Sequence, residues 1–241
     1  NFFRASSIGW NEFDRPALTP AQLGKWLFGF NPVRDLQDRL DRLANRRYDG
    51  SVILVPKNSH YSWQKGARIL GISLDSIWDV ELDQNGRLSI PHLSDLLWKA
   101  ELESRPVMMV VSVAGTTELG GIDPVHEVQN LIEKWREKGV HIWHHVDAAY
   151  GGYFCSIDRA YSDVLSVESK AGLAAVGMAD SVTLDPHKLG YVPYAAGTIL
   201  VKNRRDYYFK SYENAPYIDF LASEDRGPYT LEGSRSAAGA A

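Results

Sequence analysis

Short apolar runs alternate with amphipathic segments along the chain from Ser51 onward. Five runs are apolar or β-branched over the length of a strand, which predicts buried strands. They are SVILVP (51–56), VMMVVSV (107–113), HIWHHVD (141–147), SVTLD (181–185) and GTILVKN (197–203). Helical patterns separate them, at residues 62–70, 92–103 and 124–138. This alternation predicts an α/β fold in which helices sandwich a mostly parallel sheet.

Turn and cap signals mark the ends of several of these segments. Asn85-Gly86 is typical of a hairpin or a tight loop. Asp123 precedes a proline, so we expect Asp123 to cap a helix that has Pro124 in its first turn. Residues 156–170 show no clear period, and we expect an irregular segment there. We expect GTILVKN to pair beside the strand that precedes Lys188.

The first fifty residues differ from the rest of the chain. Residues 31–47, NPVRDLQDRLDRLANRR, combine apolar positions at helical spacing with many charges on the other face. The apolar positions are Val33, Leu36, Leu40 and Leu43. We predict a helical lead-in over residues 1–50 and one large domain over residues 51–241. The chain lacks an initiating Met and stops in SRSAAGAA, so we expect a fragment whose large domain is incomplete at its C-terminal end.

Composition narrows the classes of function. The 241 residues carry a net charge of −4 at a pI near 6.0, which offers no general attraction to nucleic acid. The longest apolar run, VMMVVSVAG, is well short of the roughly 18 residues that a membrane span needs. Cys155 is the single cysteine, which suits a reducing compartment and predicts a cytoplasmic protein. Small-molecule chemistry is the function class that this composition favours.

Four polar segments follow predicted strands, where open α/β sheets bind their ligands. They are NSHYS (58–62), GTTELGGID (115–123), HVDAAYGG (145–152) and DPHKLGY (185–191). Lysine forms Schiff bases with carbonyl cofactors, and pyridoxal phosphate also needs a carboxylate beside its ring nitrogen. Lys188 and Asp147 supply these groups, while Thr117 offers a hydroxyl donor and His60 a flat ring. Ala149 is small enough to let a cofactor ring lie beside it.

Other chemistries fit the sequence less well. His141, His144 and His145 lie on and beside one predicted strand, but adjacent strand residues face opposite sides. We therefore expect no metal site there, and instead core and surface histidines. GTTELGG lacks the lysine of a phosphate-binding P-loop, and no G-x-G-x-x-G segment is present.

Three of these segments carry a resemblance to a known family. HVDAAYGG, GTTELGGID and DPHKLGYVPYAAGTILV resemble segments of the group II pyridoxal-phosphate-dependent amino-acid decarboxylases, which have the aspartate-aminotransferase-like fold (fold type I). The resemblance runs from about Ser51 to Arg235. It implies the following site: Lys188 as the Schiff-base lysine, His187 beside the phosphate, Asp147 at the pyridine nitrogen, His60 stacked on the ring, Thr117 at a cofactor oxygen and Ala149 against the ring. It implies Lys188, His60 and Asp147 as the catalytic groups.

The sequence departs from the family's pattern at several points. The Ser/Thr-Gly-Gly segment that holds the cofactor phosphate in the family is not found, nor is the small C-terminal domain. Asp185 stands where some relatives have asparagine, and its charge would repel a phosphate unless it is turned away. Arg235 lies in a stretch that resembles the family's GSR segment, and it is a candidate for gripping a substrate carboxylate.

The resemblance implies decarboxylation of an L-amino acid to its amine and carbon dioxide, in a homodimer. The form DPHK resembles the archaeal tyrosine/aspartate decarboxylases and sphingosine-phosphate lyase. Alternatives that stay open are therefore cleavage of a Cα–Cβ bond, as in that lyase, another reaction of the same cofactor fold such as transamination or desulfuration, and a catalytically silent homologue. The identity of the substrate amino acid and of the group that protonates Cα stays open as well.

Overall fold

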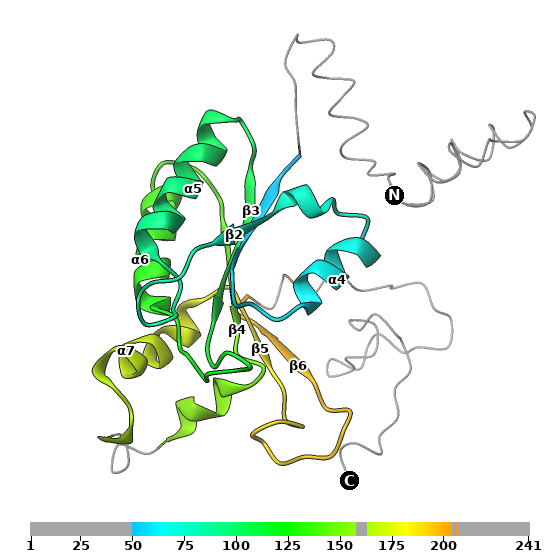
Figure 1. Cartoon of the computed structure of the whole chain (residues 1–241), viewed down its shortest axis with the longest axis vertical. Coiled ribbons are helices and arrows are strands. Elements are labelled where there is room, and N and C mark those ends of the chain that lie inside the picture. The colour runs from blue at the N-terminus through cyan, green and yellow to red at the C-terminus, as the bar shows by residue number, and fades with distance from the viewer. Residues whose placement is uncertain (1–49, 158–162, 204–205, 207–241) are drawn as a thin grey trace, which may run out of the picture.

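A computed structural model describes residues 50–157, 163–203 and 206 of the chain. Its centre is a six-stranded sheet in the order β2-β1-β3-β4-β5-β6 (Figure 1). The strands are β1 (Val52–Pro56), β2 (Ile77–Val80), β3 (Val107–Val113), β4 (Trp143–Asp147), β5 (Ser181–Leu184) and β6 (Thr198–Val201). The first five strands are parallel, and β6 pairs antiparallel with β5. The predicted mostly parallel α/β sheet is confirmed, as is the position of β6 beside β5.

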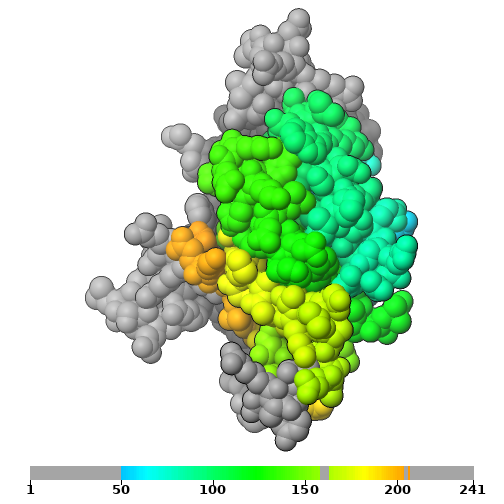
Figure 2. All heavy atoms as spheres, turned by 90° about the vertical axis from the view of Figure 1, so that its left-hand side faces the viewer, coloured from blue at the N-terminus to red at the C-terminus, as the bar shows by residue number. Residues whose placement is uncertain are grey.

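Helices cover both faces of this sheet. Three of them, α5 (Ile90–Leu102), α6 (Val125–Arg136) and α7 (Val167–Ala175), lie together on one face, while α4 (Ser62–Ile69) lies on the other (Figure 1). Figure 2 views the first face, whose surface is formed largely by the neighbouring helices α5, α6 and α7. Short 3₁₀ turns lie at Leu74–Ser76, Gly151–Ser156 and Val176–Met178. No helix in the described ranges is long and apolar enough to cross a membrane.

The core explains why these segments adopt their structures. All five side chains of β1 are buried, because this strand lies inside the sheet and has helices on both faces. Helix α5 buries Leu93, Leu97 and Ala100, which recur at helical spacing, and the side chain of Ser89 caps its first turn through His92 N. The predicted turn at Asn85-Gly86 is confirmed, since Gly86 has φ +72° and the flanking residues Leu82 and Leu88 form an antiparallel bridge.

Two local predictions were wrong. Asp123 does not cap α6, whose N-cap is Pro124 and has no side-chain cap bond. The Asp123 carboxylate is buried and accepts hydrogen bonds from Leu88 N at 2.8 Å and Val113 N at 2.7 Å instead. The segment 156–170 was expected to be irregular, but α7 begins within it at Val167, where Ser166 caps the helix through Ser169 N. The predicted lead-in helix at 31–47 lies outside the described residues.

Candidate active site

A cavity of about 640 Å³ lies at the carboxyl ends of the parallel strands. Residues that directly follow β1, β3, β4 and β5 line it, and it continues along the face of the sheet that carries α4. Its polar lining includes Asn58, His60, Ser62, Thr116, Thr117, His145, Asp147, Ser181, Thr183, Asp185 and Lys188. Because the strands are parallel, segments far apart in the sequence meet at this one edge of the sheet.

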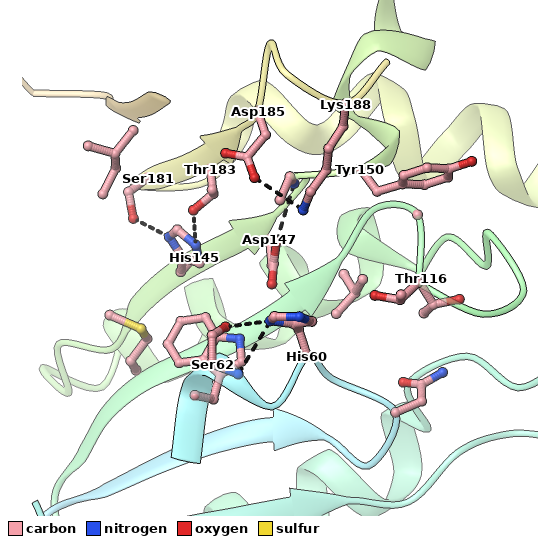
Figure 3. Close-up of a pocket in the computed structure, with 18 of the residues that line it drawn as sticks. His60, Ser62, Thr116, His145, Asp147, Tyr150, Ser181, Thr183, Asp185 and Lys188 are labelled. Carbon is pink, nitrogen blue, oxygen red and sulfur yellow. Dashed lines mark hydrogen bonds and ion pairs between the residues drawn. The ribbon is translucent and has the colours of Figure 1, made fainter. Parts of the chain in front are cut away.

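Lys188 lies in the tight turn that follows β5. Its backbone N–H donates to the carbonyl of Asp185 at 3.0 Å, and its own carbonyl accepts from Tyr191 N at 3.2 Å. The side chain of Lys188 is about one-third exposed, and its Nζ lies 3.1 Å from Asp185 Oδ2. Figure 3 shows the Lys188 amine and the Asp147 carboxylate pointing into the same part of the cavity. The turn therefore presents a lysine amine to a space that also contains a carboxylate.

Asp147 is the last residue of β4 and pairs in register with Thr183 of β5. Its Oδ1 accepts a hydrogen bond from Ala149 N at 3.3 Å. The carboxylate therefore lies at the carboxyl end of β4. Ala149 lines the cavity too, and its methyl group leaves space beside the carboxylate. A flat ring with a protonated nitrogen could use this carboxylate as a partner.

His60 and Thr117 reach the cavity from the loops after β1 and β3. The His60 Nδ1 lies 2.9 Å from Ser62 Oγ, and its ring lies against Tyr61 with a centroid separation of 4.2 Å. Thr117 is exposed, whereas the neighbouring Thr116 is buried and its hydroxyl accepts from Gly121 N at 2.9 Å. Thr116 therefore stabilises this loop. The Thr117 hydroxyl forms no comparable hydrogen bond within the loop, as far as the described residues extend.

The structure separates His187 from the other predicted site residues. Its Nδ1 donates to the carbonyl of Ala196 at 2.6 Å, its ring stacks on Tyr194, and it is not part of the described cavity lining. Its Nε2 lies 3.6 Å from Asp185 Oδ2, on the side of the turn that carries Lys188. Arg235 lies outside the described residues, so its predicted contact with substrate stays a prediction.

His145 is a cavity residue that was considered from the sequence as a metal ligand but was not predicted to belong to the cofactor site. Its Nδ1 lies 2.7 Å from Ser181 Oγ and its Nε2 lies 3.0 Å from Thr183 Oγ1. Burial lowers the pKa of His145 to about 4, against a smaller opposing effect of the Asp147 charge, so the ring is uncharged at neutral pH. The available signal was its spacing of two residues from Asp147, which places both side chains on one face of β4.

The prediction that these three residues are core and surface histidines is confirmed, since His141 is exposed. His144 and His145 are both buried, because helices cover both faces of the strand from which they point in opposite directions. His144 contacts α6 through Gln129, and His145 contacts Trp63 of α4 edge to face. Across the described ranges, no three His, Cys, Asp or Glu side chains are grouped as a metal ion would require.

Comparisons with known proteins agree with this geometry. Residues 34–240 match the family model described as the pyridoxal-dependent decarboxylase conserved domain. The chain is 36% identical to the L-tyrosine decarboxylase of Levilactobacillus brevis, over 78% of this chain and 34% of that protein. It is also 36% identical to the aspartate 1-decarboxylase of Aliivibrio fischeri, over 80% of this chain and 33% of that protein.

Solved structures show the same fold. The crystal structure of mouse CSAD superposes with a TM-score of 0.63 at 26% identity, and the match covers 77% of this chain and 36% of that chain. The chain thus spans about a third of the length of these relatives. With a family match over most of its length and a lysine and a carboxylate at one edge of the expected sheet, the chain belongs to the pyridoxal-dependent decarboxylase family.

Proposed function

We propose that this chain is part of an enzyme that uses pyridoxal 5'-phosphate to decarboxylate an L-amino acid, releasing the amine and carbon dioxide. The observation that carries the proposal is that the Lys188 amine and the Asp147 carboxylate line one cavity in a chain of this family. The relatives named above act on different amino acids, tyrosine and aspartate, at equal identity. The proposal therefore names the reaction and leaves the side chain of the substrate to experiment.

The residues of the cavity fit the cofactor. Lys188 would hold it covalently through Nζ, and Asp147 would keep a proton on its ring nitrogen. Ala149 leaves room for a flat ring, and His60 and Thr117 offer a ring and a hydroxyl on other sides of the same space. We also propose that His187 lies beside the phosphate group of the cofactor, although its ring forms a hydrogen bond with the carbonyl of Ala196 in this structure.

Pyridoxal phosphate, when bound, supplies an electron sink for the electron pair that Cα keeps as carbon dioxide departs. The residues of the chain supply charges at fixed positions around the cofactor. Asp147 supplies a negative charge at the end of β4, and the neighbouring His145 is uncharged at neutral pH and does not neutralise it. Asp185 lines the cavity too, but it forms an ion pair with Lys188, so that its charge is partly neutralised by the lysine.

We further propose that the working unit is a cytoplasmic homodimer. Tyr191 and Tyr194, in the segment that follows Lys188, are 90% and 78% exposed, which leaves two aromatic rings near the site for a partner to cover. The aromatic segment 207–220 that we expected to contribute contacts lies outside the described residues. The single Cys155 is consistent with a reducing compartment. Sedimentation of the active protein tests the dimer, and an active monomer would refute it.

The test of the proposed function has two stages. The chain is first incubated with pyridoxal phosphate, followed by visible absorbance, and then reduced with borohydride so that the modified residue can be mapped by mass spectrometry. We expect one modified lysine, Lys188, and loss of both signals in Lys188→Ala. Lys99→Ala is the matched control, because Lys99 lies on the exposed side of α5 away from the cavity.

The second stage offers aromatic, acidic and basic amino acids to the loaded protein and measures carbon dioxide and amine. Equal amounts of both products from one class of amino acid are expected. Product without carbon dioxide would point to Cα–Cβ cleavage instead. A protein that stays colourless, or that is coloured but converts none of the amino acids, would contradict the proposal and favour a catalytically silent homologue.

A further inference from the structure

We infer that Asp185 is a positioning residue for Lys188, and that its carboxylate holds the lysine ammonium at its place in the cavity before the cofactor attaches. The inference rests on the proposed function, because it concerns the residue that would hold the cofactor. Asp185 has no part in the site predicted from the sequence, where its charge stood out only as a departure from relatives with asparagine at this position.

The contacts of Asp185 fix the position of its carboxylate. Its Oδ2 lies 3.1 Å from Lys188 Nζ, and its side chain is only 15% exposed (Figure 3). Its backbone is held on both sides, because Asp185 N donates to the carbonyl of Ala149 at 3.3 Å and its carbonyl accepts from Lys188 N at 3.0 Å. A methyl group added at Gly197 would stand 3.3 Å from Asp185 Oδ1, so the backbone there also confines the carboxylate.

Other charged or titratable groups face the same space. Among the described residues that line the cavity they are His60, His145, Asp147, Tyr150 and Asp206. Outside the described cavity lining, His187 Nε2 lies 3.6 Å from Asp185 Oδ2. In the described part of the chain Asp185 is the one carboxylate in an ion pair with Lys188. Asp147 is thereby left available for another partner.

This arrangement has a consequence for attachment of an aldehyde. The ion pair restricts a long, flexible side chain to one place, which favours a productive approach. For attachment, Nζ must lose a proton to solvent before the Nζ–C bond forms and the carbonyl oxygen leaves as water. A positioning carboxylate therefore affects the highest rate of loading.

The experiment measures the rate of loading of the full chain by visible absorbance over a range of pyridoxal phosphate concentrations. In Asp185→Asn we expect the loading rate at saturating cofactor to fall by about threefold, because the amine is no longer held. The half-saturating concentration of cofactor should not rise, because the rest of the cavity is intact. A residue that only supports the fold would raise the half-saturating concentration, and that result or an unchanged saturating rate would overturn the inference.

Two further variants complete the test. Glu81→Gln is the matched control, because Glu81 pairs with Lys57 at 2.9 Å outside the cavity and its loss should change neither the saturating rate nor the half-saturating concentration. Asp185→Glu keeps the charge but shifts it by one methylene group, so the saturating rate should fall while the half-saturating concentration stays near that of the wild type. If Asp185→Asn does not fold, a Glu variant with the wild-type saturating rate overturns the inference. A wild-type chain that never loads contradicts the proposed function itself.

Discussion

His144 Nδ1 lies 2.6 Å from the side-chain oxygen of Gln129, in the interior between the sheet and α6. The amide nitrogen of Gln129 donates to Glu133 at 2.6 Å, which turns the amide oxygen toward the ring. His144 therefore donates through Nδ1 and accepts the hydroxyl proton of Ser112 through Nε2, at 2.9 Å. This chain of bonds satisfies an uncharged ring, and burial lowers the pKa of His144 to about 4.

Acid should weaken the fold through this histidine. Its folded-state pKa lies below its ordinary value of 6.5, so its stabilising contribution is complete above that value and is lost as the pH falls toward 4. Between about pH 7 and pH 5, we expect His144→Gln to lose less free energy of unfolding than the wild type, by on the order of 1–2 kcal/mol. Urea unfolding at both values measures the difference. The exposed His141→Gln should follow the wild type, and an unchanged acid response in His144→Gln would refute the assignment.

Asp123 should have the opposite pH dependence. Burial raises its pKa to about 6, although its bonds to Leu88 N and Val113 N act against that rise. Its stabilising contribution is therefore complete below the ordinary value of 3.8 and is lost as the pH rises through 6. Asp123→Asn turns an N–H group toward a backbone N–H, so we expect it to be less stable than the wild type by about 1–3 kcal/mol near pH 5. This difference in the free energy of unfolding between Asp123→Asn and the wild type should become smaller toward neutral pH.

Urea unfolding across this pH range provides the measurement for Asp123. The control is Asp95→Asn, since Asp95 is exposed on α5 and should show no deficit at either end of the range. A deficit of Asp123→Asn that grows as the pH rises would contradict the raised pKa.

Gly190 should be required for the conformation of the Lys188 turn. A methyl group at Gly190 would lie 2.6 Å from the carbonyl oxygen of Pro186 and 2.6 Å from the hydroxyl of Tyr153, both closer than contacts allow. We expect Gly190→Ala to lower the extent of cofactor loading about tenfold, with only a small change in the unfolding midpoint, because the clash displaces the turn and not the sheet. Gly66→Ala, where an added methyl group meets nothing within 4 Å, is the control. Normal loading of Gly190→Ala would show that the turn adapts.

Asp147→Asn should separate binding of the cofactor from turnover. Lys188 is unchanged in this variant, so visible absorbance should persist, but an amide cannot keep a ring nitrogen protonated. We expect turnover to fall by about a hundredfold or more, measured as carbon dioxide released from the substrate that the panel identifies. Asp79→Asn, at an exposed position of β2, should be fully active. Near-normal turnover of Asp147→Asn would remove Asp147 from its proposed role.

Much of this protein could be predicted from local patterns. The buried strands were predictable because continuous apolar runs such as residues 107–113 have few alternatives in a chain of this composition. The grouping of Lys188, Asp147, Thr117 and His60 at one cavity followed from a general rule, namely that parallel strands bring their carboxyl ends to one edge. The resemblance in HVDAAYGG and DPHKLGY then identified the family, and the comparisons confirmed it.

What the tertiary structure decided depends on contacts between residues far apart in sequence. Asp123 has the local appearance of a helix cap, yet it bonds to Leu88, which is 35 residues away, because the loop before α5 packs against the end of β3. His144 and His145 point to opposite sides of β4, and both are buried because helices cover both faces of the sheet. The direction in which Asp185 points follows from the turn that brings Lys188 back over it. Periodicity predicts which face a side chain lies on, whereas its partners depend on how the elements pack.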